Sequence, residues 1–190
     1  MNRRDALSRV ALLLGGTVIG GTVFMEGCKP ADKKYGQGEK FSPDDIAYLD
    51  EIAETIIPTT TTPGAKAAQV GIFMTVMVND CYTKDDQKIF RDGMQKVNDA
   101  SSKKFSKNFI ESSAEQRKEL LTEIDKEQKE YAKNKKDKDP NHYFRMMKEL
   151  TLLGYFTSKI GATEALRYQA VPGRYDGCLP YKKGDKAWAT

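Results

Sequence analysis

Residues 41–58 read FSPDDIAYLDEIAETIIP, and this stretch decides the fold class. Ser42 supplies a hydroxyl cap and Pro43 suits the first helical position. Two carboxylates follow in the first turn, near the positive end of the helix dipole. Apolar side chains then recur at helical spacing until Pro58 stops the helix: Ile46, Leu49, Ile52, Ala53, Ile56 and Ile57. The stretch therefore predicts an amphipathic helix with one buried face.

The chain beyond Pro58 continues this helical pattern. A threonine-rich loop precedes an apolar stretch over residues 72–78. Thr83 and Ser113 are predicted caps, and an amphipathic helix follows each of them. After a lysine-rich break, the most apolar helix of this part runs over residues 143–156. Because no segment alternates with period two, we expect an all-α single domain of about five or six helices with an irregular C-terminal tail.

The first 28 residues have the pattern of an export signal. Arg3 and Arg4 precede a short, glycine-rich apolar run, which is typical of a secretory signal. The arginine pair is typical of the twin-arginine route for folded cargo. The aromatic residue of the twin-arginine consensus is missing, so ordinary Sec export stays open. A permanent membrane helix is a weaker alternative, because the apolar run is shorter than the ~20 residues that a bilayer crossing needs.

Cys28 is the candidate lipidation site, since it follows Gly27 at the end of the apolar run. Glu26 is unusual at its position in a lipoprotein signal, so plain cleavage and an uncleaved anchor are the alternatives. We expect residues 1–28 to form the export signal, 29–40 a linker and 41–190 the helical domain. The protein is then expected to be exported, periplasmic and membrane-anchored.

Two cysteines remain once Cys28 is assigned to the anchor. In an oxidising compartment an even remainder predicts a disulfide, here between Cys81 and Cys178. The alternative is a pair of unrelated buried thiols.

The sequence offers no catalytic or cofactor-binding group of residues. Its one histidine, His142, cannot build a conventional zinc site with two distant cysteines. No Cys-x-x-Cys-His haem motif and no cysteine cluster for iron–sulfur is present. The net charge of +4 comes largely from scattered lysines, without the interleaved aromatics of a nucleic-acid surface. We therefore expect no catalytic residue, cofactor or metal in this chain, and no nucleic-acid partner.

Two blocks of sequence carry a family resemblance. The first is IAETIIP (52–58) followed by TPGAKAA (62–68); the second is KELTLLGYFTS (148–158), continuing through GAT (161–163), LRY (166–168) and VPGRYDGC (171–178). They resemble the gluconate 2-dehydrogenase subunit 3 family, over about residues 41–188.

The resemblance implies a non-catalytic small subunit. Its large partner would be an FAD-dependent oxidoreductase of the glucose–methanol–choline type that acts on sugars or sugar acids, often with a cytochrome subunit as electron acceptor. FAD is then expected in the partner, which lacks an export signal of its own and is carried across the membrane with the small subunit. Cys28 would tether this member to a membrane leaflet.

The C-terminal tail is the candidate partner-binding segment, because it carries Arg174, Tyr175, Tyr181 and Trp188, and arginine and aromatic residues dominate interface energetics. The alternative is a tail that folds back over its own helices, with Cys178 joined to Cys81. The apolar face over residues 150–156 is expected to be core rather than contact surface. The competing function is a stand-alone anchored helical lipoprotein that binds a ligand or another envelope protein.

Overall fold

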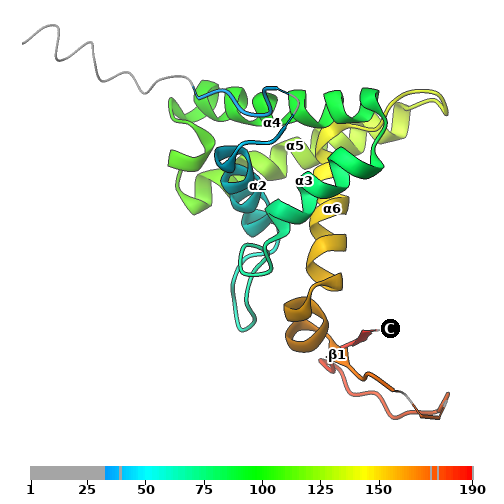
Figure 1. Cartoon of the computed structure of the whole chain (residues 1–190). Coiled ribbons are helices and arrows are strands. Elements are labelled where there is room, and N and C mark those ends of the chain that lie inside the picture. Colours follow the sequence, from blue (N-terminus) through cyan, green and yellow to red (C-terminus); the bar gives the residue numbers. More distant parts are fainter. Residues whose placement is uncertain (1–32, 39, 172, 175, 190) are drawn as a thin grey trace, which may run out of the picture. The chain divides into compact units, whose positions relative to one another are not determined.

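The computed structural model describes residues 33–38, 40–171, 173–174 and 176–189. Residues 34–190 form one unit, separate from residues 1–33, and are described by themselves. Its elements, labelled as in Figure 1, are the α-helices α2 (Pro43–Ile56), α3 (Val70–Cys81), α4 (Lys84–Phe105), α5 (Ala114–Asn134) and α6 (Tyr143–Thr157), the short helices η1 (Phe109–Glu111) and η2 (Gly161–Ala165), and the strands β1 (Arg167–Tyr168) and β2 (Trp188–Ala189). The expected export signal, with Arg3, Arg4 and Cys28, lies outside the described residues.

The expected all-α domain is confirmed in the described residues, where the two strands are only two residues long. Three of the α-helices begin at the predicted caps. The hydroxyls of Ser42, Thr83 and Ser113 accept hydrogen bonds from backbone N–H groups three residues later, at 3.1, 3.2 and 3.3 Å. Each bond satisfies one of the donors that a helix start leaves without a partner inside the helix.

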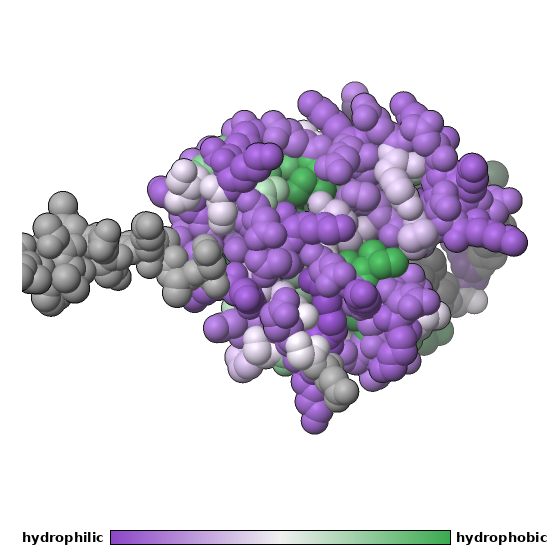
Figure 2. Space-filling view, turned by 90° about the horizontal axis from the view of Figure 1, so that it is seen from above, coloured by the Kyte–Doolittle hydropathy of each residue, from purple (hydrophilic) through white to green (hydrophobic). Residues whose placement is uncertain are grey.

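The core lies between α6 and the other four α-helices, all of which α6 contacts. Each α-helix contributes one apolar face, as the helical spacing predicts. Fully buried side chains of the core include Leu49, Ile52, Met74, Phe90, Met94 and Met147. Figure 2 shows the molecule of Figure 1 from above. On this face the surface is mostly hydrophilic, with small and separate hydrophobic spots.

The folded unit begins inside the stretch that the sequence assigns to a linker. The Tyr35 side chain is 1% exposed, and its ring stacks on that of Tyr48 with centroids 3.9 Å apart. The Gly36 N–H donates to Asp45 Oδ1 at 2.7 Å. Gly36 has a φ of +71°, and a Cβ at this position would lie 2.7 Å from the Arg91 carbonyl oxygen. Residues 35 and 36 are therefore packed against α2 and α4.

Two glycines allow α6 to approach its neighbours closely. A Cβ on Gly93 of α4 would clash with the Cβ of Tyr143 at the start of α6. A Cβ on Gly154, near the end of α6, would lie 2.6 Å from the ring of Phe73 on α3. Both glycines are buried, so any larger residue would push the helices apart.

The chain after α6 is irregular, as expected. The π-helical turn η2 follows α6, and β1 and β2 then pair in parallel through Arg167 with Trp188 and Tyr168 with Ala189. Among the described residues, no helix combines the length and hydropathy that a bilayer crossing requires.

Candidate partner-binding surface

Glu54 of α2 holds the loop that connects α2 to α3. Its Oε1 accepts hydrogen bonds from the backbone N–H and the hydroxyl of Thr59 at 2.8 and 2.7 Å, and its Oε2 accepts from the Lys66 N–H at 2.9 Å. A Cβ on Gly64 would clash with this carboxylate. The Glu54 carboxylate therefore fixes the conformation of the loop through its bonds to Thr59 and Lys66, and Gly64 leaves the space that the carboxylate occupies.

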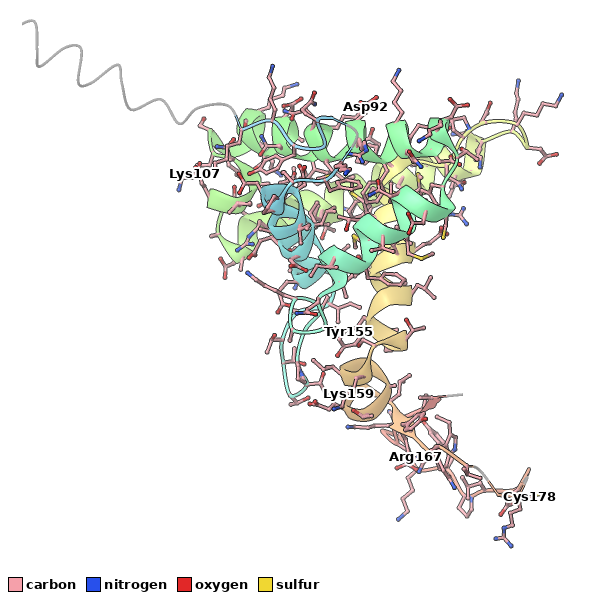
Figure 3. All side chains as sticks on the ribbon, in the orientation of Figure 1. Asp92, Lys107, Tyr155, Lys159, Arg167 and Cys178 are labelled. Atoms are coloured by element: carbon pink, nitrogen blue, oxygen red, sulfur yellow. The ribbon has the colours of Figure 1, made fainter. Side chains whose placement is uncertain are left out.

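Tyr155 of α6 joins this loop to the end of α6. Its side chain is 2% exposed, and its hydroxyl donates to the Pro63 carbonyl oxygen at 2.7 Å. Figure 3 shows Tyr155 beside the loop, where α6 extends past the other helices. Pro63 belongs to the first block of the sequence resemblance and Tyr155 to the second. The fold thus brings the two blocks together at one end of the helical unit.

The same end of α6 exposes three large apolar side chains, Leu152, Leu153 and Phe156, which we call the α6 apolar face. They are 42%, 46% and 40% exposed, whereas Leu150 is 3% exposed. The expectation that residues 150–156 form core is therefore correct only in part. At 100° per residue, positions 150, 151, 154 and 155 turn toward the bundle, while 152, 153 and 156 turn away from it.

Two carboxylates of α2, Asp50 and Glu51, bond to neighbouring segments of the helical unit. Glu51 of α2 forms ion pairs with Lys66 and Arg117. Burial raises the pKa of Glu51, but the two cationic partners outweigh burial and hold the pKa below its usual value. Asp50 accepts the Gly71 N–H at 2.7 Å at the start of α3, and burial raises the pKa of that carboxyl. These contacts tie α2 to the loop, to α3 and to α5.

The predicted tail residues do not cover the helices. From Arg167 to Ala189, every described residue except Ala189 is exposed. Tyr181 is 75% exposed, Arg174 lies 3.9 Å from Asp176, and the Trp188 ring lies 3.7 Å from the Arg167 guanidinium. Tyr175 lies outside the described residues. The structure thus contradicts the alternative of a tail folded back over its own helices.

The expected disulfide between Cys81 and Cys178 is absent from the structure. Both thiols are free and exposed, so the alternative of buried thiols is wrong as well. Cys81 ends α3, whereas Cys178 lies in the tail that leads away from η2 (Figure 3). The pairing would need the tail to fold back, and it does not.

His142 serves as a helix cap. Its Nδ1 accepts the Phe144 N–H at 3.2 Å at the start of α6. In the part of the chain that the structure describes, no group of three or more histidine, cysteine, aspartate or glutamate residues is placed to hold a metal ion.

Sequence reasoning missed the roles of Glu54 and Tyr155. Both residues lie inside the two resemblance blocks, and that is the only signal of them in the sequence. Their bonding partners are remote in sequence: Glu54 accepts from the Lys66 N–H, and Tyr155 donates to the Pro63 carbonyl oxygen. Helical periodicity identifies neither bond.

A family model described as gluconate 2-dehydrogenase subunit 3 matches residues 43–173. The match spans more than half of the chain and includes the Glu54 loop, the Tyr155 contact and the α6 apolar face. No curated protein and no solved structure matches the chain. On the family match, the chain belongs to the gluconate 2-dehydrogenase subunit 3 family.

Proposed function

We propose that this chain is the non-catalytic small subunit of an FAD-dependent dehydrogenase of the glucose–methanol–choline type, which it escorts, anchors and stabilises in the cell envelope. Membership of a family of dehydrogenase subunits supports this role. The α6 apolar face carries the proposal, because it exposes three large apolar side chains at the end where the two family blocks meet. Exposed apolar groups gathered at one place are typical of a protein interface.

The free energy to be gained by burying the α6 apolar face is consistent with a protein interface. Full burial of a leucine or phenylalanine side chain contributes about 1.5–3 kcal/mol, and these three side chains still have roughly half of that to gain. The gain is too small to form a complex by itself. It is large enough for the α6 apolar face to be an energetic centre within a wider contact.

Export and anchoring complete the proposal. Arg3 and Arg4 would direct the folded pair of subunits through the twin-arginine route, and a lipid on Cys28 would hold the pair at a periplasmic membrane surface. FAD would be bound by the large subunit, which oxidises a sugar or sugar acid, and a cytochrome subunit would accept the electrons. This chain supplies no redox group in that scheme.

The binding part is tested by co-purification of the tagged chain with the flavoprotein. Leu153→Asp with Phe156→Asp places two charges on the α6 apolar face and should reduce the bound flavin absorbance at least tenfold. Ile110→Asp is the control for a charge on an exposed apolar side chain outside this face, because Ile110 is 36% exposed on η1. Lys107, three residues before Ile110, lies far from Tyr155 in Figure 3. Equal losses for both variants, or no loss for either, would contradict the role of this face.

The export part is tested with Arg3→Lys and Arg4→Lys together. The charge of the segment is preserved, but the guanidinium pair is lost. We expect the flavoprotein to accumulate in the cytoplasm with its flavin bound. If the flavoprotein reaches the envelope when this chain is deleted, the escort role is refuted.

The competing function is a stand-alone anchored helical lipoprotein. It predicts a chain that reaches the membrane normally and co-purifies without flavin absorbance. A flavoprotein encoded beside this chain and lacking a signal peptide would speak against it.

A further inference from the structure

The described residues of the tail, 167–171, 173–174 and 176–189, are held by a small number of exposed contacts. The β1–β2 pair contributes the bond from the Arg167 N–H to the Ala187 carbonyl at 2.8 Å. Lys182 and Asp185 bond to one another in a turn, at 2.9 Å in both directions. The Lys186 ammonium donates to the Glu164 carbonyl oxygen. Gln169 Nε2 donates to the Val171 carbonyl oxygen and the Cys178 N–H donates to Asp176 Oδ1, both at 3.2 Å. With the stack of Arg167 on Trp188 and the contact of β1 with η2, the contacts of the described tail residues are local and exposed.

These contacts are too few to order the segment. A parallel pair normally belongs to a sheet covered on both faces, and an isolated two-stranded pair is marginal even when its strands are longer than two residues. The pair closes a loop of nearly twenty residues, and each ordered residue costs backbone entropy. An exposed cation–π stack and a few exposed hydrogen bonds return less than that cost. In the free chain these contacts therefore hold the tail only weakly.

The composition of the tail indicates what covers it. Residues 166–190 contain five basic and two acidic side chains, which gives this segment a net charge of +3. The segment also exposes large apolar side chains: Tyr168, Val171, Leu179, Tyr181 and Trp188. A complementary surface is acidic and has pockets for aromatic rings.

We propose that the tail becomes ordered on an acidic, partly apolar surface of the dehydrogenase subunit, with the Arg167–Trp188 stack as its anchor. This inference rests on the function proposed above and adds a second contact to the α6 apolar face. Tyr181 and Trp188 lie beyond the family match, which ends at residue 173, so the match does not assign them a role. The basic side chains steer the approach, and the aromatic rings provide most of the buried apolar area.

A protein surface fits the tail better than a lipid surface. Aromatic and basic residues also occur at membrane interfaces, usually on an amphipathic helix whose backbone groups are paired internally. Here the described backbone outside β1 and β2 is irregular, with turns and no helix, and only a few of its hydrogen bonds are internal. The hydrocarbon region of a bilayer offers no partners for the remaining N–H and C=O groups, so the aromatic rings could not be buried there without burying unpaired backbone, whereas a protein surface can pair both.

The experiment uses the full chain and the purified flavin subunit, with hydrogen exchange and affinity as the two measurements. In the free chain we expect the amides of residues 167–189 to exchange rapidly. In the complex we expect at least tenfold slower exchange in this segment. Trp188→Ala should weaken the affinity at least tenfold without changing exchange in α2–α6.

The charge contribution has its own matched control. Lys182→Glu with Lys183→Glu should weaken binding and reduce its sensitivity to salt. Lys133→Glu with Lys138→Glu makes the same charge change at two exposed positions outside the tail, one in the last turn of α5 and one in the segment that follows it, and should leave binding within twofold of the original.

The outcomes separate this inference from the proposed function. A complex that forms with an unprotected tail, and with the affinity of Trp188→Ala unchanged, overturns the inference and leaves the subunit role intact. Protection of the tail by anionic lipid vesicles but not by the flavin subunit also overturns it, in favour of a membrane contact. Failure of the intact chain to bind any flavin subunit refutes the proposed function itself.

Discussion

At the scale of single residues, Tyr35 decides where the folded unit begins. Tyr35→Ala should lower the free energy of unfolding by about 3 kcal/mol, because it empties a fully buried site and removes the stack on Tyr48. Urea unfolding followed by circular dichroism measures this loss. Lys34→Ala, at an exposed neighbouring position, should change stability by less than about 0.5 kcal/mol. Equal and small effects of both substitutions would show that residues 34–40 are a linker after all.

His142 gives the fold a pH dependence near neutrality. Burial lowers the pKa of His142 and nearby Lys96 acts in the same direction, while Glu127 partly opposes them. The unfolded chain, with a histidine pKa of about 6.5, then binds a proton more readily than the folded chain. The contribution of neutral His142 to the free energy of unfolding is therefore fully present above pH ~6.5. It is lost as the pH falls from about 6.5 toward the lower pKa of the folded state. Protonation of Nδ1 also ends its bond to the Phe144 N–H.

The substitution His142→Asn tests this pH dependence. Asparagine is a good helix cap that does not titrate, so the variant should keep the helix start and lose the fall in stability between about pH 7.5 and 5.5. Chemical unfolding at the two pH values provides the measurement. An unchanged slope in the variant would assign the pH dependence to other groups.

At the scale of elements, Gly93 determines how closely α4 and α6 pack. Gly93→Ala should destabilise the protein by about 1–3 kcal/mol, although alanine favours a helix by about 1 kcal/mol over glycine. The reason is that the new methyl group meets the Cβ of Tyr143, which cannot move without its backbone. Asp92→Ala is the control, because Asp92 is exposed one position earlier (Figure 3) and only the propensity changes. Stabilisation by Gly93→Ala would mean that the two helices are free to separate.

The two faces of α6 show what the sequence of a single helix cannot determine. Its amphipathic pattern predicts a helix with a buried face, and Phe144, Met147 and Leu150 occupy that face. The pattern cannot say whether an adjacent helix covers the other apolar positions. In the described part of the chain, Leu152, Leu153 and Phe156 stay 40–46% exposed, because the end of α6 runs past the bundle beside the Glu54 loop.

At the scale of the whole unit, the helical body does not depend on the tail. A chain that stops after Leu166 should unfold within about 0.5 kcal/mol of the full chain, since the described residues beyond it are exposed apart from Ala189. Urea unfolding of the two chains checks this. The short chain should also bind the flavin subunit more weakly. A large loss of stability would show that the tail belongs to the core.

Much of the fold could be predicted from the sequence, because its signals are local. A cap acts on an N–H group three residues away, and helical periodicity appears within a few turns. Ser42, Thr83 and Ser113 therefore predicted three helix starts correctly, and the lack of period-two alternation predicted the all-α class. The two motif blocks identified the family, which the family match confirms.

Tertiary structure alone decided the features that join residues remote in sequence. Burial of Tyr35 depends on Tyr48 and α4, and the place of Tyr155 depends on the Pro63 carbonyl. The cysteines were paired by counting, but a disulfide needs two chain segments to meet, and the tail leads Cys178 away from the helices. Local patterns state which side chains favour burial or bonding. Only the packing of the whole chain determines which of them find a partner, because a contact exists only where two distant segments converge.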